Sequence, residues 1–520
     1  MSCHGRKFSK YAPLTTGRAW RFYLHLHIDL NINVVLIEKP VMKYLFFSFL
    51  SLFLSIFSVA QPGYQIRINL KAYKENKIWL GYYYGKLKAV SDSTVLDASG
   101  NGSFRGKEKL AGGVYFVVSP NKEILFELLI DSQQHFSIMA DTGSFPSQVK
   151  FTGSPDNTMF QGYTQYMAKQ GTAISKEQAA LAKAPNKIDS GEIISRIRTL
   201  NLDVQHYRED IERKYPNSIL GAILRALKEP VVPEQEKNPA KKTDSLFAYH
   251  YYKRHYWDGV SFTDDRLIRT PIFEPKLDKY YKDLVPPDPD SINREVDKML
   301  LDSRTNKEMF KYLLVHFVQK YVNPEYMGQD AVFVHLFEKY INTGQADFFT
   351  DKYRKYVNDR AYSLMANLIG QPAANLEMVD SLDKGLPLYS VDAPFIVICF
   401  WDPTCGHCQE TVPKVDSIYQ AKWKAEGVKI YGVMVDGGKD NWIKFIKDHN
   451  LKDWINVYQT QAARDAETAS NKPGFRQLYD VYQTPILYLL DKDKRIIAKK
   501  LTYQQFDEVI DLKLKNTKSK

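Results

Sequence analysis

Two cysteines separated by two residues, Cys405 and Cys408, follow a hydrophobic, β-branched run at 395–398. Such a run predicts a buried strand, and the pattern after Cys405 is helical, so the pair lies on a turn from a strand into a helix. The free N–H groups and positive dipole end of that helix stabilise an anion and lower the pKa of the first thiol. A charged His407 would act in the same direction. The segment therefore predicts a strand–turn–helix unit with a reactive cysteine at the helix N-terminus.

The spacing of the two cysteines also predicts a two-step reaction. Cys408 comes about one helical turn after Cys405, within reach of a mixed disulfide formed there. Attack by the second thiol would release the partner and close a Cys405–Cys408 disulfide. This is dithiol–disulfide exchange, with Cys405 as the candidate nucleophile and Cys408 as the candidate resolving thiol.

Other uses of a cysteine pair fit the sequence less well. A structural zinc site needs four ligands, and the remaining cysteines, Cys3 and Cys399, are not spaced to supply them. Haem attachment needs His directly after the second cysteine, where Gln409 stands. A purely structural disulfide is the remaining alternative, although a disulfide that closes a two-residue loop at a helix start stabilises a fold only a little. We therefore expect redox chemistry, with no metal and no other cofactor.

The chain of 520 residues is too long for one hydrophobic core and predicts about three domains. Its 44% hydrophobic and 13% aromatic content is typical of globular proteins. The net charge of +11 is not gathered into a dense Lys/Arg run with interleaved aromatic residues. Nucleic-acid binding is therefore not indicated.

Residues 42–60 have the pattern of a secretory signal peptide, with a charged start, a short apolar core and small residues before Gln61. Because the pattern begins at Met42, we expect residues 1–41 to be an erroneous N-terminal extension, and cleavage near Ala60–Gln61. The apolar core is shorter than the ~20 residues that a spanning helix needs, so we expect no membrane span after cleavage. Export places the protein in an oxidising compartment, the periplasm, where so few cysteines indicate reactive rather than structural use.

Residues 61–155 alternate hydrophobic and polar positions between turns rich in Gly and Asn, as short strands do. The clearest strands are predicted at 64–70, 78–84 and 114–118. Several short strands at near-regular spacing predict a β-sandwich or small barrel. In pattern and position, this region resembles a β-rich domain of unknown function that precedes thioredoxin modules in some large periplasmic proteins.

Residues 156–368 change to a helical period, with an apolar stripe at 219–227 among the clearest segments. The aromatic residues gathered at 249–257 are expected to form core or interface rather than a ligand site. Segments 256–271 and 326–330 resemble a helical domain of unknown function found before thioredoxin modules in the same group of proteins. An all-α middle domain is therefore expected.

Residues 369–520 resemble the TlpA/ResA-type periplasmic thiol-disulfide oxidoreductases of the thioredoxin-like family. The likeness rests on the start at 369–373, the Cys-Gly-His-Cys turn, and Gln483-Thr484-Pro485 before a late strand. It implies strands at 395–401, 428–435, 455–458, 486–490 and 495–500, then a final helix at 503–514. The expected fold class is thus multi-domain: a β-sandwich-like N-terminal domain, an all-α middle domain and an α/β thioredoxin fold at the C-terminus.

The resemblance also implies roles around the cysteine pair. Pro485 would be a cis-proline facing the pair, and Thr484 would offer its backbone to an extended substrate strand. Pro413 would kink the helix and Trp401 would pack around the turn. Support of the active site is thus expected from Trp401, Gly406, His407, Pro413 and Glu410.

Two positions depart from the family pattern. Cys399 stands where thioredoxins have a buried Asp, and we expect it to be an inert buried thiol. The acid that the ResA-type proteins keep three residues after the second cysteine falls on Thr411, with Glu410 one position off. Because a helix rotates by about 100° per residue, Glu410 turns toward solvent and is a weak candidate for the base that deprotonates Cys408.

The sequence thus predicts a periplasmic thiol-disulfide oxidoreductase that reduces disulfides in exported proteins and is recharged by an unidentified thiol donor. A disulfide oxidase or isomerase is the enzymatic alternative, because the donor sets the direction of exchange. A second alternative is an interaction protein whose thioredoxin module is a docking appendage, since redox chemistry leaves the first two domains unexplained.

Overall fold

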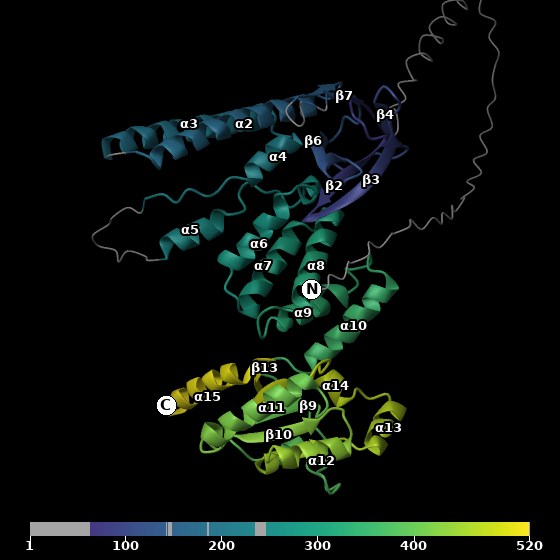
Figure 1. Ribbon diagram of the computed structural model, residues 1–520, viewed down its shortest axis with the longest axis vertical. Helices are drawn as coiled ribbons and strands as arrows, with labels where there is room; N and C mark the ends of the chain where they lie inside the picture. Colours follow the sequence, from purple (N-terminus) through teal and green to yellow (C-terminus); the bar gives the residue numbers. More distant parts are fainter. Residues whose placement is uncertain (1–62, 142, 144–147, 185–186, 235–245, 519–520) are drawn as a thin grey trace, which may run out of the picture. The chain divides into compact units, whose positions relative to one another are not determined.

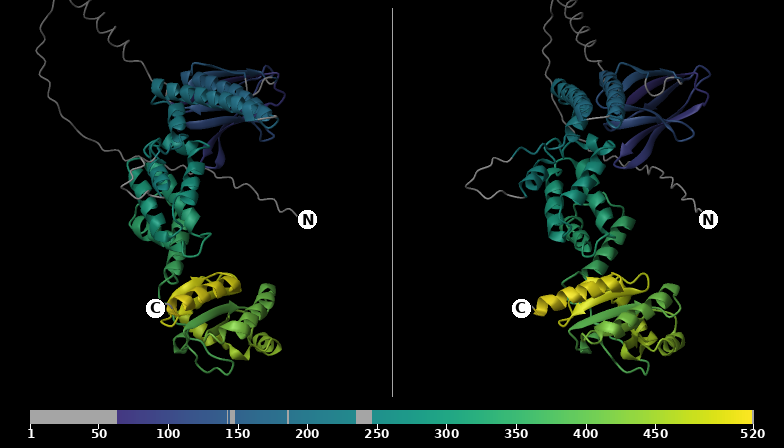
Figure 2. Two further views of the ribbon diagram at one scale, coloured as in Figure 1. Left: turned by 90° about the vertical axis from the view of Figure 1, so that its left-hand side faces the viewer. Right: turned by 60° about the vertical axis from the view of Figure 1, so that its left-hand side comes forward.

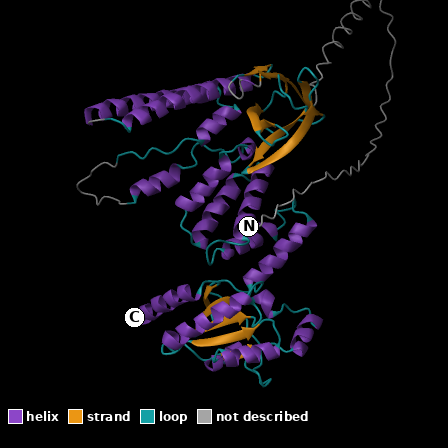
Figure 3. Cartoon of the chain, in the orientation of Figure 1, coloured by secondary structure: helices purple, strands orange, loops and turns teal. Residues whose placement is uncertain are grey.

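The computed structural model describes residues 63–141, 143, 148–184, 187–234 and 246–518 (Figure 1). The expected extension at 1–41 and signal peptide at 42–60 therefore lie outside the described residues. Within the described ranges, no helix is long and apolar enough to cross a membrane. Figure 3 shows a strand-rich part, a helical part and a part that mixes strands and helices, and the elements follow one another along the chain in that order.

The N-terminal part is a β-sandwich of two four-stranded sheets, ordered β4-β1-β7-β8 and β3-β2-β5-β6. Side chains from both sheets share one core, because inward positions alternate along strands such as the one carrying Ile66, Ile68 and Leu70. This confirms the β-sandwich-like fold. The strands are β1 (Tyr64–Lys71), β2 (Lys77–Tyr84), β3 (Leu87–Val95), β4 (Asn101–Gly106), β5 (Gly113–Val118), β6 (Ile124–Ile130), β7 (His135–Asp141) and β8 (Val149–Thr152).

The middle part is helical, as predicted. Its first two helices are long and lie side by side (Figure 2). Ser218 caps the helix that carries the apolar stripe, because its side chain accepts a hydrogen bond from the N–H of Gly221 at 3.0 Å. The helices are α2 (Pro155–Leu181), α3 (Lys187–Lys214), α4 (Ile219–Ala226), α5 (Phe247–His255), α6 (Phe273–Asp283), α7 (Pro289–Asp302), α8 (Lys307–Tyr321), α9 (Asp330–Leu336) and α10 (Asp351–Met365).

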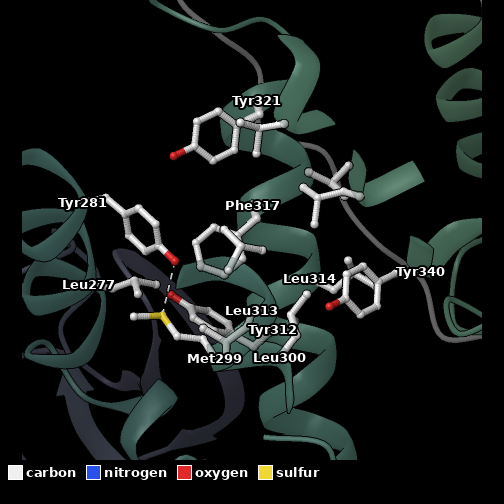
Figure 4. Close-up of a cluster of buried hydrophobic side chains, with 14 of the residues drawn as sticks. Leu277, Tyr281, Met299, Leu300, Tyr312, Leu313, Leu314, Phe317, Tyr321 and Tyr340 are labelled. Carbon is white, nitrogen blue, oxygen red and sulfur yellow. Dashed lines mark hydrogen bonds between the residues drawn. The ribbon is translucent and has the colours of Figure 1, made fainter. Parts of the chain in front are cut away.

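Helices α6 to α9 share a core of Leu, Phe and Tyr side chains (Figure 4). Phe317 is fully buried, and the hydroxyl of Tyr281 donates to the sulfur of Met299 at 3.5 Å. The aromatic cluster expected to be core lies against these helices. Tyr256 is buried, and its hydroxyl donates to the carbonyl oxygen of Lys276 at 3.0 Å. Tyr249, Tyr252 and Trp257 are partly buried against the same core, whereas His250 is exposed.

The C-terminal part has a five-stranded sheet ordered β11-β10-β9-β12-β13. Strands β9, β10 and β11 are parallel, and β12 and β13 are antiparallel to their neighbours. One face of the sheet is covered by α11, α12 and α15, of which α15 is yellow in Figure 2. The elements are β9 (Phe395–Trp401), α11 (Gly406–Ile418), β10 (Lys429–Met434), α12 (Lys439–Asp448), β11 (Ile455–Tyr458), α13 (Gln461–Ala469), α14 (Phe475–Leu478), β12 (Ile486–Asp491), β13 (Ile496–Lys499) and α15 (Tyr503–Lys518).

Polar contacts join the end of the helical part to the C-terminal domain. The hydroxyl of Ser363 donates to the carbonyl oxygen of Gln477 at 2.5 Å, and the Asn367 amide donates to that of Leu478 at 3.0 Å. The buried ammonium of Lys499 donates to the side-chain oxygen of Asn367 at 2.6 Å. Because buried polar groups are costly when unpaired, these bonds tie α10 and the residues that follow it to α14 and β13.

Candidate active site

Strand β9 ends at Trp401, and a short turn carries the chain into α11. The carboxylate of Asp402 accepts hydrogen bonds from the N–H and the hydroxyl of Thr404, both at 2.7 Å. This side-chain turn stabilises the tight reversal after the strand. It places Cys405 at the N-cap of α11, with the first free N–H groups of the helix behind it.

Cys405 is partly exposed, and its environment favours the thiolate. The backbone N–H of Cys408 is the main cause that lowers the pKa of the Cys405 thiol below its ordinary value. The backbone N–H of His407 and the thiol of Cys408 act in the same direction. The N–H groups at the start of α11 therefore stabilise the thiolate, and the His407 side chain is exposed on the same turn.

Cys408 has the opposite character. Its side chain is fully buried, and burial raises the pKa of its thiol to about 11. The backbone N–H of Asp402 donates to its sulfur at 3.4 Å. Near neutral pH, Cys405 is therefore the better nucleophile of the two, and Cys408 is held protonated behind it.

The turn before β12 completes the site. The peptide bond between Thr484 and Pro485 is cis, and the carbonyl oxygen of Thr484 accepts a hydrogen bond from the Cys405 thiol at 3.6 Å. The structure thus brings together Cys405, Cys408, Thr484 and Pro485 across 79 residues of sequence.

The other residues predicted around the site have distinct positions. Trp401 is buried, with its ring 5.0 Å from that of Phe445, and Gly406 and His407 form the first turn of α11. Pro413 lies inside α11. Their functional roles remain predictions.

Glu410 and Cys399, at or beside the two positions that depart from the family pattern, have opposite surroundings. Glu410 is exposed, as its place on the helix predicts, and Cys399 is fully buried in the same core as Cys408. Burial raises the pKa of the Cys399 thiol far above its ordinary value, which fits an inert thiol. Among the described residues, no group of three or more His, Cys, Asp or Glu could hold a metal ion.

Asp402 is a site residue that the sequence reading did not single out. It shapes the turn through its carboxylate and contacts the Cys408 sulfur through its N–H. The signal that could have found it is an Asp two residues before a Thr at the end of a strand, the pattern of a side-chain turn.

Alkylation rates should report the difference between the two thiols. With iodoacetamide near neutral pH, we expect Cys405 to react at least about tenfold faster than Cys408, because the thiolate is the reacting form. The Cys405 rate should level off at a lower pH than the rate of a free thiol, because its pKa is lowered, whereas the Cys408 rate should still rise toward pH 11. Peptide mass spectrometry over a pH series measures both rates, and equal labelling would contradict the assignment.

The fold and the cysteine turn define the class of the protein: it is a multi-domain protein with a C-terminal thioredoxin-like domain. Residues 369–499 match the AhpC/TSA family. Residues 204–364 and 64–160 match two domains of unknown function, DUF5106 and DUF4369. The C-terminal domain is therefore a thioredoxin-like domain of the AhpC/TSA type.

Three solved structures illustrate what this chain is similar to. A domain of a possible thiol-disulfide isomerase from Cytophaga hutchinsonii is 35% identical over 29% of this chain and 97% of its own, with a TM-score of 0.26. A thioredoxin-like protein from Bacteroides caccae is 22% identical over 55% of this chain and 98% of its own, with a TM-score of 0.43. A thiol:disulfide interchange protein from Bacteroides sp. is 22% identical over 28% of this chain and 91% of its own, with a TM-score of 0.24. None of the curated proteins matches the chain.

Proposed function

We propose that the protein is an exported thiol-disulfide oxidoreductase that reduces disulfides in exported proteins through Cys405 and Cys408. The observation that carries the proposal is the contrast between the two thiols: Cys405 is partly exposed with a lowered pKa, and Cys408 is buried with a raised one. That contrast suits an attacking and a resolving thiol on one helix turn.

The reaction proceeds in two exchanges. The Cys405 thiolate attacks one sulfur of a substrate disulfide, the substrate S–S bond breaks, and the departing substrate thiolate takes up a proton. Cys408 then loses its proton and attacks the Cys405 sulfur, which releases the second substrate thiol and closes the Cys405–Cys408 disulfide. Two electrons and two protons pass to the substrate, and an external thiol donor must restore the dithiol.

The residues around the pair have supporting parts in this scheme. The backbone of Thr484 and Pro485 would hold the substrate chain beside the Cys405 sulfur, because the Thr484 carbonyl already lies 3.6 Å from it. Trp401 fixes the end of β9 from inside the core, and Gly406, His407 and Pro413 belong to the helix that presents the pair. Glu410 is exposed, so its part is at most indirect.

Export is proposed from the sequence of residues 42–60, which has the signal-peptide pattern. In an oxidising compartment, a dithiol is kept reduced only by a dedicated donor, so a reductase there depends on a thiol partner. The proposed partners are accordingly protein disulfides on one side and that donor on the other.

The direction of exchange is tested by the reduction potential of the full-length protein. Stabilisation of the Cys405 thiolate favours the reduced form, so we expect a potential somewhat above the ~−270 mV of thioredoxin but below about −180 mV. Equilibration with glutathione buffers, followed by trapping and mass analysis, measures it. A value near ~−120 mV, typical of strong bacterial disulfide oxidants, would contradict the reductase direction and favour an oxidase.

A further inference from the structure

A pocket of about 440 Å³ adjoins the turn that carries Thr484 and Pro485. Gln483 and Ile486, the residues on either side of that turn, line the pocket, and Tyr356, Asp359 and Arg360 of α10 line it as well. The helical domain therefore contributes part of a concave surface next to the backbone at which a substrate chain is expected.

An ion-pair network forms the polar part of this pocket. The carboxylate of Asp480 is 2% exposed and accepts hydrogen bonds from both Arg360 and Lys500. Burial alone would raise the pKa of Asp480, but the bonds from the two cations outweigh it, so the pKa lies below its ordinary value. Two cations thus share one ionised carboxylate.

Of the two cations that pair with Asp480, Lys500 is the one available to a ligand. Arg360 is engaged further, because its guanidinium also donates to the side-chain oxygen of Asn323 at 3.2 Å. Lys500 is 35% exposed, and its ammonium has three donors, of which Asp480 accounts for one. The other acid of the pocket, Asp359, is paired with Lys355 at 2.7 Å. The lining thus holds two acids and two cations, and Lys500, the more exposed of the two cations, has donors left for a ligand.

Two exposed aromatic rings flank the charged residues. Tyr482 is 74% exposed and Tyr356 is 45% exposed. The guanidinium of Arg360 lies 6.0 Å from the ring centre of Tyr482. Large exposed aromatic side chains beside a pocket are typical of surfaces that bind polypeptides, because they offer contact area at little cost in conformational entropy.

We propose that this pocket binds an acidic side chain of the disulfide substrate, close in sequence to the cysteine that Cys405 attacks. The proposal rests on the proposed function and adds a substrate class to it: polypeptides with Asp or Glu flanking the reacting cysteine. The ammonium of Lys500 faces the bound carboxylate, and Tyr356 and Tyr482 contact the neighbouring chain. The helical domain thereby takes part in substrate selection.

Three symmetric peptide disulfides test this selection on the full-length reduced protein. Each joins two copies of one short peptide through its cysteine, with Glu, Gln or Lys at the two positions on both sides. Rates of peptide thiol release are divided by the rates with dithiothreitol alone, which removes differences in the intrinsic reactivity of the disulfides. We expect the Glu peptide to react about threefold faster than the Gln peptide, the scale of a partly exposed charge pair, and the Lys peptide to be slowest.

Variants identify the residue responsible. Lys500→Gln should bring the Glu and Gln peptides to equal normalised rates. Lys444→Gln removes an exposed ammonium of α12, outside the pocket lining, and should keep the preference. Equal rates for the unaltered protein, or a preference that survives Lys500→Gln, would overturn the inference.

A salt series on the unaltered protein gives a second test that does not depend on the folding of a variant. The preference for Glu should shrink between about 0.01 M and about 1 M salt, because the Debye length falls from about 30 Å to about 3 Å. A preference that does not change with salt would overturn the role of charge. If none of the three peptides is reduced, the proposed function fails, and this outcome is distinct from equal reduction of all three.

Discussion

Replacing Cys405 by serine should lower the rate of insulin disulfide reduction above the dithiothreitol control by at least about a thousandfold, which leaves only the rate of that control. The reason is that a serine hydroxyl does not ionise near neutral pH, so the helix N-terminus has no thiolate to stabilise. Cys408 does not take over the attack, because it is fully buried and its pKa is raised to about 11. Turbidity of the reduced insulin chains measures the rate.

The matched control is the third described cysteine. Cys399 is fully buried in the core of the C-terminal domain, so Cys399→Ala removes a thiol without touching the exposed turn. We expect this variant to keep insulin reduction within about twofold of the unaltered protein, with a small loss of stability from the lost sulfur. If the unaltered protein and Cys405→Ser are equally inactive, the enzymatic account is wrong.

The parts of the fold that the sequence predicts well are those with one dominant physical signal. Strand β9 was expected at 395–401 and occupies those residues, because a short apolar run with β-branched residues is buried on both faces of a parallel pair. The β-sandwich is predicted from the alternation of hydrophobic and polar residues along its strands. Strands β3 and β4 are harder to predict from this alternation, because β3 is largely exposed and β4 is short.

The long helices α2 and α3 show a second limit of prediction from the sequence. They run for 27 and 28 residues but bury few apolar side chains, so the periodicity that marks a helix is weak. The sequence predicts helix for this region as a whole and does not divide it into a hairpin. Capping residues are more informative: Ser154 accepts a hydrogen bond from the N–H of Asn157 at the start of α2.

The candidate site also has parts that the sequence predicts and parts that it does not. The cysteine pair and the proline of the facing turn are visible as short motifs. The approach of α10 to that turn is not, because it depends on pairs such as Arg360 and Asp480, which are 120 residues apart. Contacts of this kind follow from how domains dock, for which a single sequence carries no local signal.

The most direct test of the proposed chemistry is covalent trapping with Cys408→Ser. The Cys405 thiolate should still attack a substrate disulfide, but no thiol of the helix turn remains to resolve the mixed disulfide, so the adduct should accumulate. Cys399 is no substitute, because burial keeps its thiol protonated. Mixing the reduced variant with an unfolded, disulfide-containing protein should convert most of it into an adduct that dithiothreitol releases.

Non-reducing electrophoresis and mass spectrometry of the adduct read out the result. The account predicts one substrate chain joined to Cys405 in the Cys408→Ser variant. It predicts little or no adduct with Cys405→Ser, or with the variant that carries both Cys405→Ser and Cys408→Ser. Trapping by Cys405→Ser, or an adduct attached to Cys399, would contradict the assigned roles of the two thiols. The absence of any adduct with Cys408→Ser would contradict the central claim that this protein exchanges disulfides through Cys405.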